Sequence, residues 1–564
     1  MVKSGESCQQ CPPSFKPALY KGQSKNVLKK KSSVSPSTPM LHQSARDDMM
    51  THDDTPTPVV KVELYALLSL CGPIVVSSIL LFALNIEDQL IVGHLLQKSD
   101  LAAVAIGTTF FNLFWYVLIG LMSGIDTFSS QAYGAKQMAD VGLWSQRGLF
   151  VCLAACVPII LIALTSTESI VSNVFKQNPT VSAKSAMFVR WLMPGLPFLV
   201  IADVIRRWLQ VQGHLRPAVT TGICVNLFNI GFNFLLVSQF GLIGSPIATS
   251  LSRMLQVLLL VAIVKHRNLH LTHSNSIGCV TTWPAWDWKH VLQPQALASF
   301  MEVALPGAAM LLLEAGAFET STLIVGSLND LNVLDAHFVL LSLCGFSFVA
   351  FPLSVSIACS IRVGNLLGSS LPKHAQMAAY LSIALGTGFM AVNGIVFATC
   401  KDVLGAIFTS DPAIIHMVGQ IALIAACFQV VDGIQGSNAG ALRGCGRQKY
   451  VMMTNLLGFW IIGIPVGALL CFQGNLGVFG VWWGLTIGLT IAAVVSSAIL
   501  YRVDWTHESV LALARVAGVK GTESTIGNDT SVGNVALLIT DTAENNREQE
   551  TQVVEMYESL PGVD

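Results

Sequence analysis

The chain has 564 residues, of which 52% are hydrophobic and only 12% are charged, with a formal net charge of -1. Soluble domains carry about a quarter charged residues, so this composition and a mean hydropathy of +0.61 exclude an ordinary soluble protein and indicate an integral membrane protein. The balanced charge gives no reason to expect a nucleic-acid partner.

Residues 1–62 come first and are rich in Ser, Thr, Pro and Lys without apolar periodicity, which predicts a disordered cytoplasmic tail. No signal peptide is expected, since the first apolar run begins only after this polar stretch. The tail contains one CxxC, Cys8 to Cys11, without a second pair or a histidine partner. We therefore expect neither a metal site nor a cofactor.

About twelve apolar segments of roughly 20 residues follow, each long enough to cross a bilayer as a helix. The expected spans are 64–92, 101–123, 143–165, 185–208, 217–238, 243–264, 300–327, 334–358, 376–400, 413–440, 450–472 and 478–501. Lys and Arg gather in the loops on one side of these spans, so the positive-inside rule places that side and both termini in the cytoplasm.

An internal repeat divides the apolar region. "IVG" at 91–93 recurs at 324–326, and Pro73 recurs as Pro306, both at an offset of 233 (324 − 91 = 233; 306 − 73 = 233). Two further matches follow in order, "LQVQG" at 209–213 with "LRGCG" at 442–446, and "GLIG" at 241–244 with "GVFG" at 477–480. A repeat at nearly constant offset on equivalent helices predicts two halves of similar structure.

The expected fold is an all-α integral membrane protein of two six-helix lobes related by a pseudo-two-fold axis. The expected parts are a tail at 1–62, an N-terminal lobe at 63–264, a cytoplasmic linker at 265–298, a C-terminal lobe at 299–503 and a disordered cytoplasmic tail at 504–564. Transporters built from parallel repeats bind substrate between their lobes and rock to alternate access. A receptor or scaffold needs no such repeat, and no HExxH or GxSxG pattern suggests a membrane enzyme.

Two acidic residues, Glu314 and Glu319, stand inside the apolar span at 310–326. A carboxylate in the apolar layer is expensive and persists only with a polar cavity, a partner or a proton. Five positions correspond to about 500° of helix, which leaves the two about 140° apart. Three interpretations are open: the two glutamates border one broad cavity, a bend at Gly316 brings them together, or they have different functions. The plainer alternative is a neutral glutamate that hydrogen-bonds a neighbouring helix.

The first and fifth spans carry further polar candidates. Glu87 and Asp88 lie near the outer end of the first span, where a hydrated interfacial role is the alternative to a cavity role. Asn226, Asn229 and Asn233 follow at i, i+3 and i+7 and therefore share one face of the fifth span. Such amides either hold helices together or line a cavity in the N-terminal lobe.

The tenth span places Gln429, Asp432, Gln435 and Asn438 along one slowly turning polar strip. A polar strip in a membrane normally faces protein or water, so we expect Asp432 to act in a cavity of the C-terminal lobe and the amides to line it.

A second group of charges is expected at a helix end. Asp203, beside Arg206 and Arg207, is expected to form an ion pair in a cytoplasmic loop.

Five ordered stretches resemble the multidrug and toxic compound extrusion (MATE) family of eukaryotic type. They are "GIDTFSSQAYGAK" at 124–136, "LQVQGHLRP" at 209–217, "MLLLEAGAFE" at 310–319, "SIRVGNLLG" at 360–368 and "ALRGCGRQ" at 441–448. The resemblance implies a V-shaped antiporter that exports amphiphilic organic compounds in exchange for protons, or for sodium in some members. It also implies that Glu314 and Glu319 match a pair that serves proton coupling and substrate binding, and that Gln131 and Gly134 belong to a structural gating motif.

The expected activity is secondary active antiport of drugs, toxins, secondary metabolites or organic ions by alternating access, with the proton as coupling ion. Two alternatives stay open, a sodium-coupled exporter of the same fold and a lipid-linked oligosaccharide flippase of related architecture. The flippase would favour several basic groups in the cavity, whereas the sequence predicts almost no Lys or Arg inside the helices. We expect a monomer in the plasma membrane or the vacuolar membrane.

Overall fold

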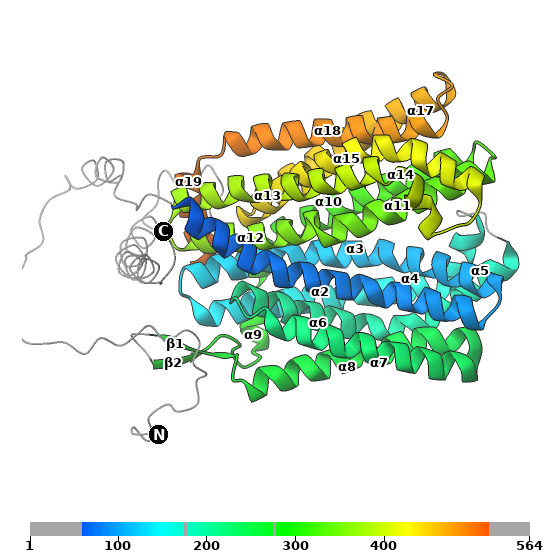
Figure 1. The fold of residues 1–564 in the computed structure, drawn as a ribbon. Helices are drawn as coiled ribbons and strands as arrows, with labels where there is room; N and C mark the ends of the chain where they lie inside the picture. The colour runs from blue at the N-terminus through cyan, green and yellow to red at the C-terminus, as the bar shows by residue number, and fades with distance from the viewer. Residues whose placement is uncertain (1–58, 174–177, 275–277, 518–564) are drawn as a thin grey trace, which may run out of the picture.

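The protein is described here by a computed structural model that covers residues 59–173, 178–274 and 278–517. Long helices lie side by side in one bundle, with α19, α9 and two short strands at one of its ends (Figure 1). Residues 1–58 and 518–564 hold most of the two predicted tails, including the Cys8 to Cys11 motif, and they lie outside the described residues.

Six spans form the N-terminal lobe. Its helices are α2 (Val60–Leu95), α3 (Lys98–Gly134), α4 (Met138–Asn173), α5 (Pro179–Leu192), the 3-10 turn η1 (Met193–Gly195), α6 (Leu196–Val211), α7 (Arg216–Phe240), the 3-10 turn η2 (Gly241–Ile243) and α8 (Gly244–His266). The expected fourth span is interrupted between α5 and α6, where Pro194 and Pro197 each lack an amide hydrogen. Between α7 and α8 the chain reverses at Gly241, whose φ of 62° is a left-handed conformation that glycine adopts readily.

The segment between the lobes is folded. It contains β1 (Leu271–Ser274), β2 (Gly278–Thr281) and the short helix α9 (Trp288–Val291). The strands pair antiparallel, with Leu271 opposite Thr281. The Trp208 indole of α6 donates to the Thr282 carbonyl at 3.0 Å, and Arg147 of α4 donates to the His290 carbonyl at 3.1 Å. The linker is therefore docked on the N-terminal lobe.

Six further spans form the C-terminal lobe. Its helices are α10 (Pro294–Gly326), α11 (Leu331–Ala350), α12 (Pro352–Gly368), α13 (Pro372–Thr399), α14 (Lys401–Leu404), the 3-10 turn η3 (Gly405–Ile407), α15 (Pro412–Gly444), α16 (Gln448–Asn455), the π-helical stretch η4 (Leu456–Gly463), α17 (Ile464–Phe472) and α18 (Val478–Tyr501), followed by α19 (Trp505–Val516). The expected span at 334–358 is interrupted at Phe351, because Pro352 cannot continue the hydrogen-bond ladder of α11.

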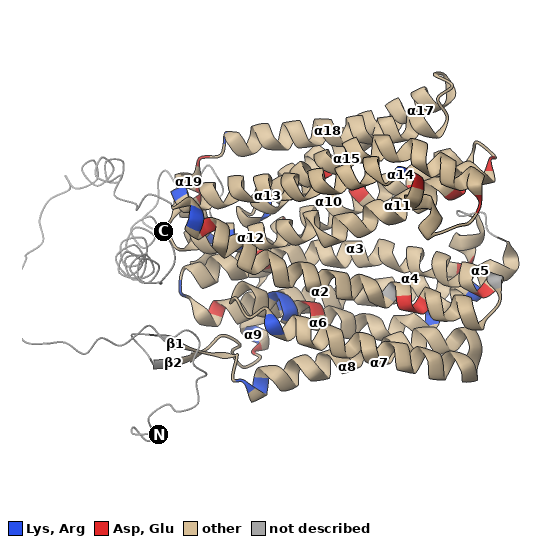
Figure 2. Ribbon diagram, viewed as in Figure 1, with Lys and Arg blue, Asp and Glu red and all other residues tan. Residues whose placement is uncertain are grey.

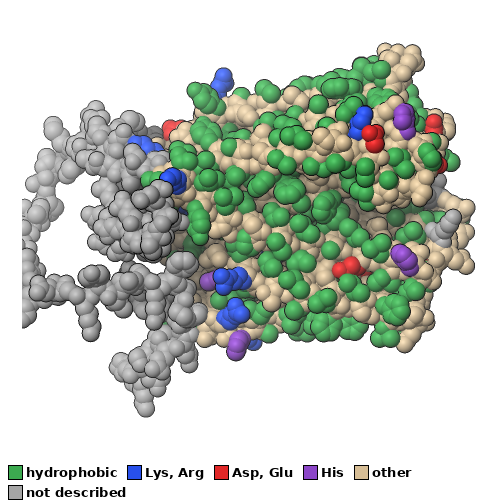
Figure 3. Space-filling model, viewed as in Figure 1, with side chains coloured by type: hydrophobic (Ala, Val, Ile, Leu, Met, Phe, Trp, Pro, Cys, Tyr) green, Lys and Arg blue, Asp and Glu red, His purple; other side chains and the backbone are tan. Residues whose placement is uncertain are grey.

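The described helices match the expected membrane architecture. Eleven stretches are long and apolar enough to cross a membrane, and the longest, Arg216–His266, consists of the two helices α7 and α8. Apolar side chains such as Leu227, Phe234 and Val392 are more than 60% exposed on the flanks of the bundle. On the face seen in Figure 3, hydrophobic side chains extend along the length of the bundle. The prediction of an all-α integral membrane protein with about twelve helices is confirmed.

Charge distinguishes the two ends of the bundle (Figure 2). Lys and Arg gather at the end that carries α19, α9 and the strands, and we call this the basic end. The described chain both starts and finishes at the basic end, since α2 begins there and α19 lies there (Figure 1).

The lobes are joined tightly from the middle of the bundle to the basic end. One apolar core contains Phe128 and Ile125 of α3 together with Phe300 of α10 and Val355 of α12. At the basic end, Arg362 of α12 forms a two-bond ion pair with Glu63 of α2, at 2.8 and 2.9 Å.

The predicted tail boundaries are wrong at both membrane borders. Residues 505–516 form the helix α19, which buries Trp505 and the carboxylate of Glu508. Glu508 pairs with Arg447, and Ser509 donates to the Leu367 carbonyl at 2.9 Å, so tertiary contacts order the first part of the predicted tail. At the other border α2 begins at Val60, within the predicted 1–62 tail.

Candidate functional site

A small cavity lies among helices of the C-terminal lobe. Its polar lining consists of Glu314 from α10, Ser356 from α12, Asp432, Gln435 and Arg443 from α15, and Asn455 from α16. Four separate elements thus bring two carboxylates, one guanidinium and two amides to the same space. Glu314 and Asp432, two of the predicted candidates, are brought together here.

A chain of hydrogen bonds positions the Glu314 carboxylate. The amide of Asn455 donates to Glu314 Oε2 at 3.3 Å and to the Met310 carbonyl at 3.2 Å. Gln435 donates to Asn455 Oδ1 at 3.0 Å, and Ser496 of α18 donates to Gln435 at 2.7 Å. Because each amide uses both of its ends, the direction of these bonds is fixed and an amide donor is always turned toward Glu314.

Asp432 completes the acidic side of the cavity. It is only 5% exposed and lies within electrostatic reach of Glu314. Arg443 supplies the one guanidinium in the cavity lining, and it lies within electrostatic reach of Glu314. With both acids ionised, the two carboxylates and the one guanidinium that line the cavity leave one negative charge uncompensated, so the cavity is suited to take up a proton or another cation.

Glu319 occupies a different place from Glu314. It does not line the cavity, whereas the Tyr116 side chain of α3 lies within electrostatic reach of both glutamates. Tyr116 belongs to the N-terminal lobe, so both glutamates lie within reach of the other lobe, and the cavity lining alone distinguishes them. α10 runs without interruption from Pro294 to Gly326, so the two carboxylates are separated by the turn of the helix.

The predicted polar strip on α15 splits into separate environments. Asp432 and Gln435 line the cavity, whereas Asn438 faces α18, where it donates to Ser496 at 2.9 Å and Ser497 at 2.8 Å. Gln429 is fully buried, and neither atom of its amide has a hydrogen-bond partner among the described residues. Gln429 and Asn438 therefore do not line the cavity.

A second acidic cluster lies within the N-terminal lobe. Asp88 accepts hydrogen bonds from Asn233 at 2.8 Å, Asn229 at 3.4 Å and Thr249 at 2.6 Å. Glu87 accepts from Asn229 at 2.9 Å.

Buried Arg253 of α8 lies within electrostatic reach of Asp88, and its guanidinium lies over the Phe111 ring, 4.7 Å from the ring centroid. Asp88 therefore has hydrogen-bond donors on both oxygens and a positive charge nearby. Asn226, on the same face of α7, donates instead to the Leu80 carbonyl at 3.1 Å and so ties α7 to α2.

Asp203 forms the predicted ion pair, but the prediction that this pair lies in a cytoplasmic loop is wrong. Asp203, Arg206 and Arg207 are all less than 10% exposed, and they lie on α6 within the bundle. Asp203 pairs with both arginines, and Arg207 also pairs with Asp126 of α3. The ion pair is buried because the last turns of α6 pack against α3 and α4 and not against water.

The expectation of almost no Lys or Arg inside the helices is also wrong. Arg207, Arg253 and Arg443 are each at most 5% exposed within membrane-spanning stretches. Each faces at least one acid, which offsets the large cost of burying a charge.

The predicted gating residues lie where the lobes meet at the basic end. Gln131 of α3 donates to the Gly444 carbonyl of α15 at 3.0 Å. A Cβ on Gly134 would lie 2.0 Å from the Asn365 carbonyl oxygen of α12. Pro73 and Pro306 lie inside the long helices α2 and α10, at equivalent positions of the two lobes.

Sequence reasoning did not select Asn455, Thr249, Arg253 or Arg443. An ionisable residue within an apolar span is a functional candidate by default, and this rule would have selected Arg253. Nothing in the local pattern distinguishes Asn455 or Thr249, since their importance depends on which helix face meets Glu314 or Asp88.

A family model and individual relatives assign the chain to the same family. The sequence model of the MatE family matches residues 73–235 and 306–469, two blocks whose starts are 233 residues apart (306 − 73 = 233). Multidrug and toxin extrusion protein 1 of Danio rerio is 31% identical over 467 residues, 82% of this chain and 76% of the relative. Multidrug and toxin extrusion protein 2 of Mus musculus is 32% identical over 474 residues, 83% of this chain and 79% of the relative.

Solved structures agree with these relatives. The crystal structure of the eukaryotic MATE transporter AtDTX14 superposes with a TM-score of 0.74 at 27% identity, covering 81% of this chain and 99% of that one. A MATE in the bent conformation superposes with a TM-score of 0.69 at 16% identity, covering 81% and 100%, and this second likeness supports the fold alone.

Proposed function

Because the chain belongs to the MATE family, we propose that it is a secondary active antiporter that exports amphiphilic organic compounds in exchange for protons. Drugs, toxins, secondary metabolites and organic ions are the substrate classes. The proton is the coupling ion, and no cofactor takes part. The membrane is the plasma membrane or the vacuolar membrane, and the protein acts as a monomer.

One observation carries the proton assignment. Glu314 and Asp432 line one cavity together with a single guanidinium, that of Arg443, so one proton neutralises the cavity. Loading that proton removes the negative charge that would otherwise attract a cationic substrate. Proton and substrate thus compete for the same charge, which is sufficient for coupling.

The geometry also supports a direction for the cycle. By the positive-inside rule the basic end faces the cytoplasm, with both termini on that side. The lobes are closed at that end, so in this state the proton enters from the opposite side and the substrate leaves there. Reopening of the basic end then exposes the cavity to the cytoplasm, where the proton leaves and the next substrate binds.

Sodium coupling is the alternative that the same site supports, because two carboxylates in one cavity also suit a small cation. A flippase finds less support, since the acids of the cavity outnumber its one arginine. The family relatives, whose names describe extrusion of drugs and toxins, favour export of small organic molecules.

The test is transport of a fluorescent organic cation by the purified protein in liposomes, first under an imposed pH gradient and then under an imposed sodium gradient. We expect the pH gradient alone to drive accumulation and Glu314→Gln to abolish it. The matched control is Glu302→Gln, which removes an exposed acid from the basic end of the same helix α10.

Each outcome decides the assignment. Loss in Glu314→Gln with normal activity in Glu302→Gln supports the proton site at Glu314. Transport that follows sodium in the wild type would replace the proton by sodium. Transport that survives Glu314→Gln would remove Glu314 from the coupling mechanism and direct attention to Asp88 and Asp432.

A further inference from the structure

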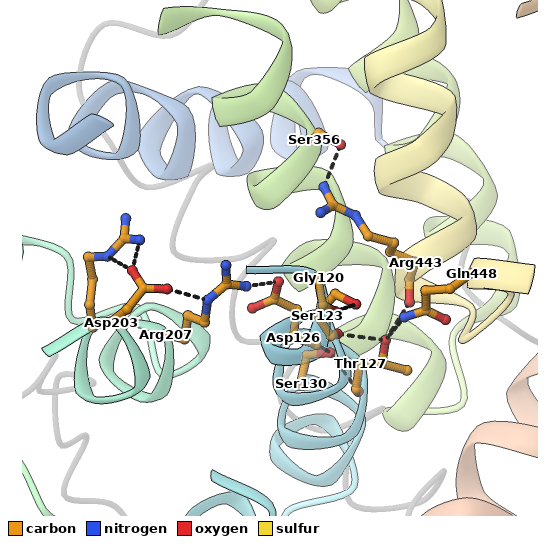
Figure 4. A network of polar contacts seen from close by, with 11 residues as sticks. Gly120, Ser123, Asp126, Thr127, Ser130, Asp203, Arg207, Ser356, Arg443 and Gln448 are labelled. Atoms are coloured by element: carbon orange, nitrogen blue, oxygen red, sulfur yellow. Dashed lines mark hydrogen bonds and ion pairs between the residues drawn. The ribbon is translucent and has the colours of Figure 1, made fainter. Parts of the chain in front are cut away.

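The backbone at Arg443 forms part of the contact between the lobes (Figure 4). The Arg443 carbonyl accepts a hydrogen bond from Thr127 Oγ1 of α3 at 2.7 Å, and Gln448 of α16 donates to the same hydroxyl at 2.8 Å. Together with the bond from Gln131 to Gly444, these contacts define what we call the seam. The seam closes the basic end of the bundle.

The Arg443 side chain reaches from the seam into the cavity that holds Glu314. One guanidinium nitrogen donates to Ser356 Oγ at 2.6 Å. The Nε atom is fully buried and has no hydrogen-bond partner among the described residues, so one N–H group of the guanidinium is unused. It is therefore not locked to one partner.

Arg443 faces two acids that belong to different lobes. Asp126 of α3 and Glu314 of α10 both lie within its electrostatic reach, as do Arg207 of α6 and Cys359 of α12. Asp432, about three turns earlier on the same face of α15, lines the same cavity.

Asp126 has one oxygen paired with Arg207, while its other oxygen, Oδ1, is buried without a partner among the described residues. A buried acceptor on the N-terminal lobe and a buried donor on the C-terminal lobe are thus both unused across the seam. A buried polar group without a hydrogen-bond partner costs free energy. A small movement of the two lobes toward each other would let these two groups pair and would remove that cost.

We propose that Arg443 is the positioning residue that links the protonation state of Glu314 to closure of the seam. The inference rests on the proposed function, since it assumes that Glu314 exchanges protons. When Glu314 is charged, it shares the guanidinium with Asp126 and the attraction across the seam is weaker. When Glu314 is neutral, the guanidinium is left to Asp126 and the basic end is held closed.

The linkage is reciprocal, as it must be for any pair of coupled equilibria. Opening of the basic end moves Asp126 away from Arg443, which leaves the guanidinium to Glu314 and favours its charged form. The proton is then released on the side to which the cavity has just opened. A single arginine thus gives both the conformational response to the proton and the release of the proton at the correct side.

The test measures the seam directly and not transport. Spin labels carried by noncanonical amino acids at positions 216 and 449 report the distance between the lobes, because Arg216 and Lys449 are exposed on opposite lobes at the basic end. We expect the ratio of short to long distances to rise about tenfold from about pH 9 to about pH 5, within the 5- to 150-fold range usual for coupled sites. Arg443→Gln should reduce this pH response to less than about twofold, and Arg443→Lys should retain most of it.

A matched control distinguishes loss of the link between Glu314 and the seam from a general weakening of the contact between the lobes. Arg362→Gln removes a guanidinium that also joins the lobes at the basic end, through Glu63, but that does not line the cavity. It should shift the distances at every pH and leave their pH response unchanged. If Arg443→Gln does not fold, Asp126→Asn replaces it, because removal of the partner acid should flatten the response in the same way.

The outcomes distinguish this inference from the proposed function. A full pH response in Arg443→Gln, or a response equally flattened in Arg362→Gln, overturns the role of Arg443 while proton-driven transport stands. A pH response that persists in Glu314→Gln shows that Glu314 is not the titrating group and overturns both.

Discussion

Substitution of Gly134 by alanine should prevent the basic end from closing as it does in this structure. Gly134 is the last residue of α3, and a Cβ there would lie 2.0 Å from the Asn365 carbonyl oxygen and 3.0 Å from the Ser369 backbone nitrogen of α12. Real Cβ contacts stay above 3.0 Å, so the two helices must move apart by at least 1.0 Å (3.0 − 2.0 = 1.0). Both obstacles are backbone atoms, so no side chain can turn away to make room.

The size of the effect follows from the cost of overpacking. Forcing extra atoms into a packed contact costs about 1–3 kcal/mol, which corresponds to a change of roughly 5- to 150-fold in the ratio of closed to open molecules. The clash exists only in the closed state, so the whole cost appears in this ratio. We expect transport to fall by a similar factor while the protein stays folded in the membrane.

The assay compares transport, the distance between labels at positions 216 and 449, and thermal stability. Gly388→Ala is the matched control, because Gly388 is an exposed helical glycine of α13 with no atom within 4 Å of an added Cβ. Normal transport and an unchanged distance in Gly134→Ala would refute the conclusion that the seam closes by this backbone contact.

Three further predictions concern folding and the cavity. Asn455→Leu removes the amide between Glu314 and Gln435, and we expect about 1–3 kcal/mol of lost stability and a lower rate of transport, measured by thermal unfolding and by uptake. Glu508→Gln leaves Arg447 and Arg515 without their shared carboxylate and should lower stability by about 3 kcal/mol, whereas an unchanged melting temperature would show that α19 is not held by this pair. Trp208→Phe removes the hydrogen bond to Thr282 and should cost about 1 kcal/mol, with faster proteolysis of the linker as its readout and unchanged proteolysis as its refutation.

Apolar spans were predictable because a helix in a bilayer satisfies its own backbone hydrogen bonds, so length and hydropathy are sufficient to find it. The spans expected at 64–92 and 478–501 correspond to α2 and α18 within a few residues. The resemblance to the MATE family was also visible in ordered motifs and is confirmed by the family match.

The parts that failed depend on contacts between distant segments. α19 stands at the start of a polar stretch, and its helix is held by Leu367, Cys445 and Arg447, whose partners in α19 follow them by 61 to 142 residues. Likewise, Asp126, Arg207 and Arg443 lie far apart in the sequence. Only the packing of α3, α6 and α15 brings them to one buried place.

The placement of Glu314 and Glu319 illustrates the limit within a single helix. Their angular separation was computable from the sequence, but three interpretations remained. The structure places Glu314 in the lining of the cavity and Glu319 outside it, while both lie within electrostatic reach of Tyr116 of the other lobe. Their roles in coupling stay predictions.

The docked linker limits how the two lobes can move. The hairpin and α9 are attached to the N-terminal lobe through Trp208 and Arg147, and α10 begins at Pro294. Only Leu292 and Gln293 stand between α9 and α10, and two extended residues span about 7 Å. Because this connection is so short, the two lobes cannot separate where α9 meets α10. Relative motion is therefore restricted to a swing about a fixed pivot, and a longer flexible insert at 292–293 would uncouple the two halves mechanically while leaving each binding site intact.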